Sequence, residues 1–84
     1  MPKERQSFER YSFPDHAKVV TPSNTLELDD WGVLFIGGTG DVTVKTAEGD
    51  IVTFANIPNG TRLNVIVRQV LVTGTNATGI LVLY

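Results

Sequence analysis

Few side chains in this sequence could carry catalysis. His16 is the only histidine, and the chain has no cysteine, so a Cys–His nucleophile and a thiolate metal site are both excluded. A serine nucleophile paired with His16 would have to come from the same irregular N-terminal stretch, which lacks the rigid support that a catalytic triad requires. The sequence therefore predicts no catalytic residue, and we expect a protein that is not an enzyme.

Two further segments have the residue types of a ligand site without its spacing. Asp29-Asp30 and Asp41 do not follow the D-x-[DN]-x-[DN]-G pattern that supplies the oxygen ligands of a calcium loop. The run Gly37-Gly38-Thr39-Gly40 follows an apolar segment, but a strand pattern comes next, where a dinucleotide site would have a helix. We therefore expect neither a metal nor a cofactor.

The charge balance limits the partners. The 84-residue chain has nine acidic and seven basic residues and a formal charge of −2, which argues against nucleic-acid binding because phosphate backbones select basic surfaces. No apolar run approaches the roughly 18 residues of a membrane span, and the charged start MPKERQSFER lacks the apolar core of a signal peptide. We expect no nucleic-acid partner and no membrane partner.

The composition indicates an all-β fold. Valine, threonine and isoleucine make up 26 of the 84 residues, and β-branched side chains favour strands over helices. Strands separated by Gly/Pro/Asn turns are expected at 31–36, 41–46, 51–54, 63–73 and 80–84. Residues 25–84 are thus predicted to form a small antiparallel β-sandwich or barrel of about five strands. Residues 1–24 are predicted to form an irregular, extended N-terminal arm.

The spacing of apolar residues predicts which side chains point inward. In the hairpin at 41–54, alternation assigns to the inner face Val42, Val44, Val52 and Phe54. In the strand at 63–73, the apolar residues change phase at Arg68-Gln69, from Leu63, Val65 and Val67 to Val70 and Val72. A β-bulge there would keep both sets on one face. The other explanation is that both faces of this strand are buried.

Two of the expected strands, at 31–36 and 80–84, are apolar on both faces. A domain of about 60 residues is marginally stable alone, and one face of a small antiparallel sheet normally meets water. We therefore expect a homo-oligomer in which these strands meet a second copy. The expected subunit-interface residues are Trp31, Leu34, Ile36, Leu81, Leu83 and Tyr84.

Four segments of the sequence, taken in order, resemble a known family. They are VTPSNT at 20–25, LFIGGTGDV at 34–42, DIVTFANIPNGT at 50–61 and VTGTNAT at 72–78. Together they resemble the spike base proteins of gene transfer agents and related tailed phages, whose pattern runs TPSDT, GGAGD, DTVTFANVPAGT and an ATGTTAT-like loop. The resemblance covers the chain from about residue 19 to its end, and Asn24 stands where the pattern has Asp.

The resemblance implies a structural virion protein on the capsid surface, made in the host cytoplasm, that assembles as a ring on the head and connects it to a fibre. Its partners would be copies of itself (a pentamer rather than a trimer), the major capsid protein and a spike fibre protein. The arm residues expected to contact the capsid are Arg5, Phe8, Arg10, Tyr11 and Phe13. The loop residues expected to form the fibre platform are Gly37, Gly38, Thr39, Gly40, Thr75 and Asn76.

Two alternatives remain open from the sequence. A small carbohydrate-binding module could stack a sugar ring on Trp31, Tyr11 or Tyr84, although Trp31 falls in an apolar run. A related fold could also sit on a tail, as a tail-associated virion protein.

Overall fold

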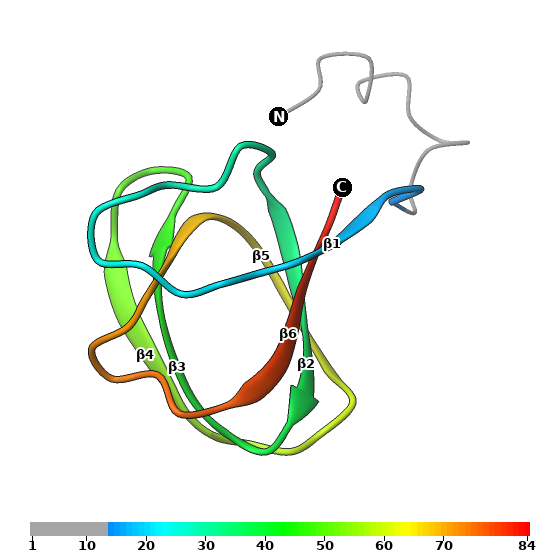
Figure 1. The fold of residues 1–84 in the computed structure, drawn as a ribbon, viewed down its shortest axis with the longest axis vertical. Helices are drawn as coiled ribbons and strands as arrows, with labels where there is room; N and C mark the ends of the chain where they lie inside the picture. The colour runs from blue at the N-terminus through cyan, green and yellow to red at the C-terminus, as the bar shows by residue number, and fades with distance from the viewer. Residues whose placement is uncertain (1–13) are drawn as a thin grey trace.

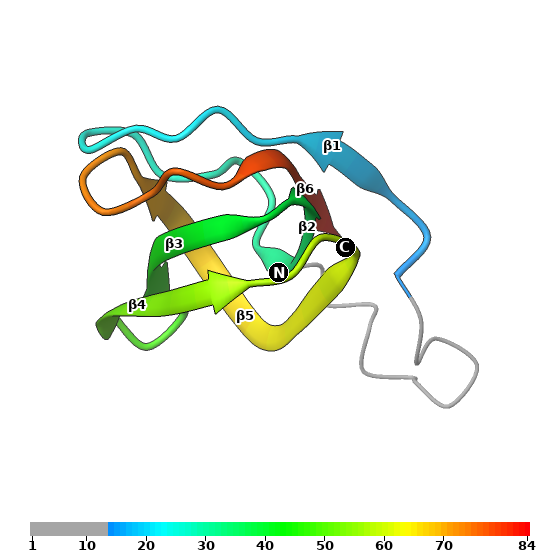
Figure 2. The same ribbon diagram turned by 90° about the horizontal axis from the view of Figure 1, so that it is seen from below.

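The computed structural model describes residues 14–84. Its strands are β1 (Ala17–Val19), β2 (Gly32–Gly38), β3 (Gly40–Thr46), β4 (Ile51–Ile57), β5 (Thr61–Leu71) and β6 (Thr78–Leu83). They form one antiparallel sheet in the order β1-β6-β2-β5-β3-β4, which curls around a core and stays open between β1 and β4 (Figure 1, Figure 2). The all-β prediction is confirmed, with a sixth strand, β1, added to the five expected.

Side chains alternate between the inside and the outside of the curled sheet. On β2, Leu34 and Ile36 are fully buried, and on β6 the side chains of Ile80 and Val82 are almost fully buried. The complete set of buried apolar residues is Val20, Leu34, Ile36, Val42, Val44, Ile57, Val67, Val70, Ala77, Ile80 and Val82. Removing this apolar surface from water is the main stabilising contribution to the fold.

A β-bulge lies in the middle of β5. The register with β3 shifts between Lys45 and Thr46, so that Arg68 is left without a partner in the ladder and is the extra residue of the bulge. Because of this extra residue, Val67 and Val70 both point into the core and are fully or almost fully buried. The predicted bulge is confirmed at this position.

One of the inner-face predictions is wrong, and a second residue is less covered than expected. Val72 is 52% exposed, and Val52, which lies on the inner side opposite the buried Val44, is 40% exposed. β4 is an edge strand with only β3 beside it, so Val52 lacks a covering strand on one side. β5 ends at Leu71, so Val72 already belongs to the loop that follows it.

The segment after β1 is fastened along β5. The Ser23 N–H donates to the Val70 carbonyl at 2.8 Å, and the Leu28 N–H donates to the Arg68 carbonyl at 2.7 Å. The side chain of Asn24 also hydrogen-bonds to Val72 and Thr73, which directly follow β5. These bonds fix a long irregular segment to the sheet and pair several of its backbone groups although it forms no strand.

Part of the predicted arm therefore belongs to the β-body. Strand β1 pairs with β6 from Ala17↔Leu83 to Val19↔Leu81, and Val20 is part of the core. The predicted irregular conformation of 1–24 is thus wrong for Ala17–Val19, which form a strand, whereas residues 20–24 are irregular and are bonded to the body. Residues 1–13 lie outside the described part of the chain, and for them the arm stays a prediction.

The molecule has two different ends along its longest axis (Figure 1). At one end, the Tyr84 carbonyl accepts hydrogen bonds from the N–H groups of Asp15 and His16, at 3.3 and 3.2 Å. The start of the described chain and its last residue therefore lie together. At the other end, the β2–β3 turn contacts the β4–β5 turn, where the Asn59 N–H donates to Thr39 Oγ1 at 3.2 Å.

Candidate docking surfaces

Three exposed surfaces of residues 14–84 are candidates for docking a partner. Within residues 14–84, no group of three or more His, Asp or Glu side chains could hold a metal ion, and no helix is long and apolar enough to cross a membrane. The His16 ring stacks on the Tyr84 ring with centroids 5.1 Å apart. The Nε2 atom of His16 lies 3.7 Å from Asp15 Oδ1. The His16 ring is thus held against Tyr84 at the end of the chain.

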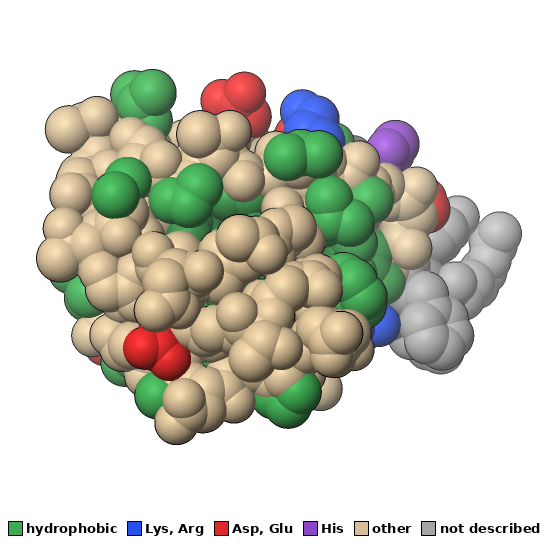
Figure 3. All heavy atoms as spheres, turned by 60° about the horizontal axis from the view of Figure 1, so that its bottom comes forward, with side chains coloured by type: hydrophobic (Ala, Val, Ile, Leu, Met, Phe, Trp, Pro, Cys, Tyr) green, Lys and Arg blue, Asp and Glu red, His purple; other side chains and the backbone are tan. Residues whose placement is uncertain are grey.

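The first surface is the outer side of β1, β6 and β2, which we call the outer apolar face. Its residues are Val19, Val33, Phe35, Leu81 and Leu83. They point outward because the alternate residues of β2 and β6 fill the core. Cross-strand pairing sets Phe35 beside Leu81, and Leu81 beside Val19. Val19 is 79% exposed, and Figure 3 shows apolar side chains gathered to the right of the centre of the molecule.

The predicted subunit interface is corrected at two positions. Leu34 and Ile36 have no exposed surface, so neither can touch a second copy of the chain. The outward neighbour Phe35 was missed, although alternation along β2 could have identified it once one inward residue was known. Of the other predicted interface residues, Leu81 and Leu83 lie on the outer apolar face, while Trp31 and Tyr84 are half-buried.

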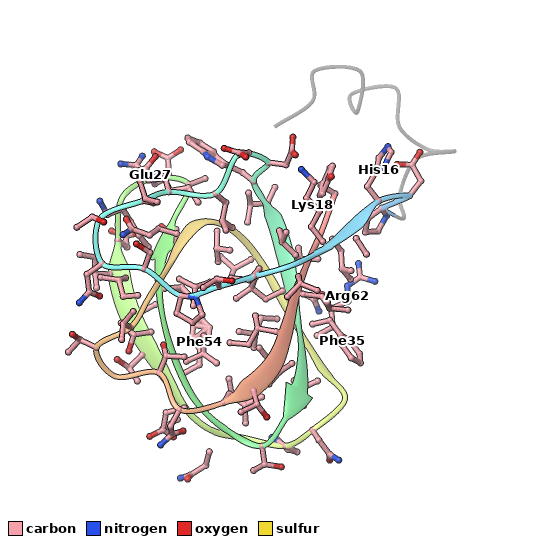
Figure 4. The ribbon with its side chains drawn as sticks, viewed as in Figure 1. His16, Lys18, Glu27, Phe35, Phe54 and Arg62 are labelled. Atoms are coloured by element: carbon pink, nitrogen blue, oxygen red, sulfur yellow. The ribbon has the colours of Figure 1, made fainter. Side chains whose placement is uncertain are left out.

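Basic side chains border the outer apolar face. Arg62 is exposed and pairs across strands with Phe35, and Figure 4 shows the two side chains beside each other. The Lys18 Nζ lies 3.1 Å from Asp30 Oδ2 and 5.7 Å from the centroid of the Tyr84 ring. The hydrogen bond to Asp30, followed by the interaction with Tyr84, raises the pKa of Lys18 above its usual value of 10.5.

The second surface is the free edge of β4. This strand, Ile51–Ile57, is seven residues long and contains no charged residue. Ile51 is 58% exposed. Glu48 and Asp50, in the turn that precedes the strand, are exposed. An apolar strand edge with acidic residues at one end is thus open to solvent on the side opposite β3.

The third surface is the loop end, formed by Gly37–Gly40 together with Thr75 and Asn76. The structure brings these two predicted groups together, because Asn76 Oδ1 accepts a hydrogen bond from the Asp41 N–H at 2.7 Å. Thr75 Oγ1 accepts another from the Thr43 N–H at 2.9 Å. The two side chains therefore hold the loop against β3. Figure 3 shows this end mostly as uncharged polar surface.

Trp31, the only tryptophan, packs against an ion-paired cluster. The Arg68 guanidinium lies over its ring, 5.5 Å from the centroid. The Arg68 Nε is 3.1 Å from Glu27 Oε2, an ion-pair distance, although its N–H is not aligned for a hydrogen bond. The Lys45 Nζ is 3.9 Å from the same oxygen. Because Arg68 occupies one face of the indole, that face is not free to stack on a sugar ring.

The predicted capsid-contact residues fall outside the described part of the chain. They are Arg5, Phe8, Arg10, Tyr11 and Phe13. Residues 1–13 continue from Pro14, at the end of the molecule where Asp15 and Tyr84 meet.

Comparison with known proteins finds similarity to a chain of a solved assembly. No protein-family model matches the sequence, and no curated protein matches it. A chain in "Capsid of native GTA particle computed with C5 symmetry", where GTA denotes a gene transfer agent, is 26% identical to this one, with a TM-score of 0.75. The match covers 84% of this chain and 83% of that chain. This chain is therefore similar in both sequence and fold to a component of a gene transfer agent capsid.

Proposed function

We propose that this protein is a structural, non-enzymatic virion protein of the gene transfer agent and tailed-phage type. The observation that carries this proposal is the similarity, over most of both chains, to a chain of a gene transfer agent capsid. The finer proposal is that the protein is the base of a head spike, on the capsid surface. That role is supported by the four sequence segments that resemble spike base proteins.

A ring of five copies is the assembly we propose. The C5 symmetry of the similar capsid particle supports a pentamer over a trimer, since five-fold positions of a capsid accept five-fold partners. The exposed apolar surfaces on the two flanks of the sheet supply area that a subunit contact would bury. Synthesis in the host cytoplasm fits a cysteine-free chain.

The two ends of the molecule suit the two partners of a spike base. In this proposal the residues that contact the major capsid protein are Arg5, Phe8, Arg10, Tyr11 and Phe13, which precede Pro14 at one end. The loop end lies at the opposite end of the long axis (Figure 1). Its rigid turns, Gly37–Gly40 with Thr75 and Asn76, form the platform for the spike fibre.

Binding to isolated heads tests the capsid contact. The full-length triple variant Phe8→Ser, Tyr11→Ser and Phe13→Ser should lose co-sedimentation with heads that lack the protein, while keeping its native mass. Val72→Ser is the matched control, because Val72 is an exposed apolar residue outside the three surfaces. Undiminished head binding by the triple variant would contradict the proposed contact. Binding of the wild-type protein to tails, and not to heads, would favour the tail-associated alternative.

A further inference from the structure

The curled sheet ends in two strands, β1 and β4, that each leave one edge unpaired. They lie on opposite sides of the molecule in both ribbon views (Figure 1, Figure 2). Proteins usually protect such edges with charged side chains, prolines or very short strands. β1 is short, but β4 has none of these protections over its seven residues. The free edge of β4 is therefore suited to pairing with another strand.

We propose that β4 of one copy pairs with β1 of the next, so that the sheet continues from copy to copy around the ring. This inference rests on the ring in the proposed function and names the two edges that build it. The contact is head-to-tail because its two sides differ, and such contacts close into a ring when the rotation between copies permits. Both ends of the long axis remain free for other partners.

The backbone groups on the outer edge of β1 are available for this pairing. The N–H groups of His16 and Val20 donate to carbonyls of the residues at 84 and 80. Because hydrogen-bonding direction alternates along an antiparallel ladder, the N–H and C=O groups of Ala17 and Val19 face away from β6.

The free edge of β4 offers groups with the same spacing. The Thr46 N–H donates to the Asp50 carbonyl at 2.8 Å, which fixes the phase of the ladder between β3 and β4. Ile51 and Thr53 consequently direct their N–H and C=O groups away from β3. Each edge thus provides two outward residues spaced two apart, which is enough for two hydrogen-bonded residue pairs across the junction.

The side chains at the two edges also match. Ala17 and Val19 lie on the outer side of β1, since their partners on β6 belong to the outer apolar face. Ile51 lies on the outer side of β4, because its partner Lys45 alternates with the buried Val44. Pairing the two edges would therefore extend the outer apolar face of one copy onto Ile51 of its neighbour.

The exposed charges near the two edges favour this contact over β4–β4 pairing. Arg62, on β5, reaches an open depression of about 320 Å³ beside β1 that Ala17, Leu83 and the acidic Asp15 also line, and Arg62 has no ion-pair partner within residues 14–84. Glu48 and Asp50 are exposed beside β4. Opposite charges steer such a contact and disfavour β4–β4 pairing, in which the partner edge carries no basic residue.

A mixing experiment tests the two edges separately. Val19→Pro removes an outward N–H from β1, and Thr53→Pro removes one from β4, while the bonds to β6 and β3 are kept. Each variant alone should be a monomer by native mass spectrometry under conditions where the wild-type chain is a ring. An equimolar mixture should give dimers, because one intact β1 edge meets one intact β4 edge. Val19→Ala and Thr53→Ala keep the N–H groups and should still form rings.

Each other outcome overturns a different statement. A wild-type chain that stays monomeric contradicts the ring itself. Rings formed by both proline variants overturn the strand junction and leave the ring intact. Monomers after Thr53→Pro, with rings after Val19→Pro, would show that β4 pairs with something other than β1.

A charge series keeps the inference testable if a proline variant fails to fold. Ile51→Glu and Ile51→Lys remove the same exposed apolar side chain but place opposite charges at the junction, on the outer side of the sheet that also carries Arg62 of the neighbour. We expect Ile51→Lys to weaken assembly at least about tenfold more than Ile51→Glu. Arg62→Glu should reverse that order, and an unchanged order would overturn the proposed junction.

Discussion

Asn76 occupies the space into which a β carbon on residue 40 would project. An atom there would lie 2.5 Å from Asn76 Oδ1 and 2.7 Å from the Ala77 nitrogen. The same Oδ1 accepts the hydrogen bond from the Asp41 N–H. Glycine at position 40 therefore allows the loop before β6 to lie directly on the start of β3, and this contact builds the loop end.

Gly40→Ala should accordingly destabilise the fold. The added methyl group meets backbone atoms of Ala77 that cannot move aside freely, and overpacking of this kind costs about 1–3 kcal/mol. Urea unfolding monitored by circular dichroism measures the change. Gly49→Asn is the control, because a β carbon at Gly49 meets nothing within 4 Å and asparagine tolerates a left-handed backbone. Equal losses in the two variants would contradict the steric argument.

Asn24 joins the segment after β1 to the end of β5. Its Oδ1 accepts hydrogen bonds from the N–H groups of Val72 and Thr73, at 2.9 and 3.3 Å, and its Nδ2 donates to Thr73 Oγ1 at 3.1 Å. Asn24→Ala removes these exposed hydrogen bonds, whose groups can then bond to water, and should lower the free energy of unfolding by about 0.5–1.5 kcal/mol.

Asn24→Asp is the informative comparison for this site. A carboxylate keeps the acceptor for both N–H groups and strengthens those bonds by its charge, while the Thr73 hydroxyl can turn to donate. We expect the stability of Asn24→Asp to equal or exceed that of the wild-type protein in the same urea titration. A loss as large as that of Asn24→Ala would mean that the Nδ2 donor matters most.

The ion pair of Lys18 with Asp30 should make the stability of the protein depend on pH in the alkaline range. The pKa of Lys18 is raised above 10.5, first by the hydrogen bond to Asp30 and then by Tyr84. The stabilising effect is fully present below the unfolded pKa of 10.5 and is lost as the pH rises through the folded value. The wild-type protein should therefore lose stability relative to Asp30→Asn as the pH rises above 10.5. Parallel pH profiles of the two proteins would show that the pair contributes nothing.

The strands of the body could be predicted from the sequence, but β1 could not. The five predicted strands have apolar alternation or runs bounded by Gly/Pro/Asn turns, which are local signals. β1 is three residues long, Ala17–Val19, and all three are exposed. It is a strand because it pairs with β6 at the other end of the chain, and no local pattern records such a partner.

For the outer apolar face, the sequence predicts which strands are apolar but not which of their side chains point outward. The sequence shows that the segment around Phe35 is apolar on both faces, which raises the question of a partner. It does not show which face the core takes, because Leu34 and Phe35 are equally apolar. By contrast, the sequence predicts only that the loops of Gly40 and Asn76 lie at one end, and the contact between them depends on how the loop between β5 and β6 lies on the start of β3.

Leu34 and Phe35 are adjacent residues that point in opposite directions, so truncating each tests this assignment of faces. Leu34 is fully buried, and Leu34→Ala should lower the free energy of unfolding by about 2–5 kcal/mol. Phe35 is half-buried on the outer apolar face, so Phe35→Ala should cost less than about 2 kcal/mol and should instead weaken assembly. Chemical unfolding of the monomer and native mass spectrometry of the assembly separate the two effects. A larger loss of monomer stability from Phe35→Ala than from Leu34→Ala would mean that the two faces are exchanged.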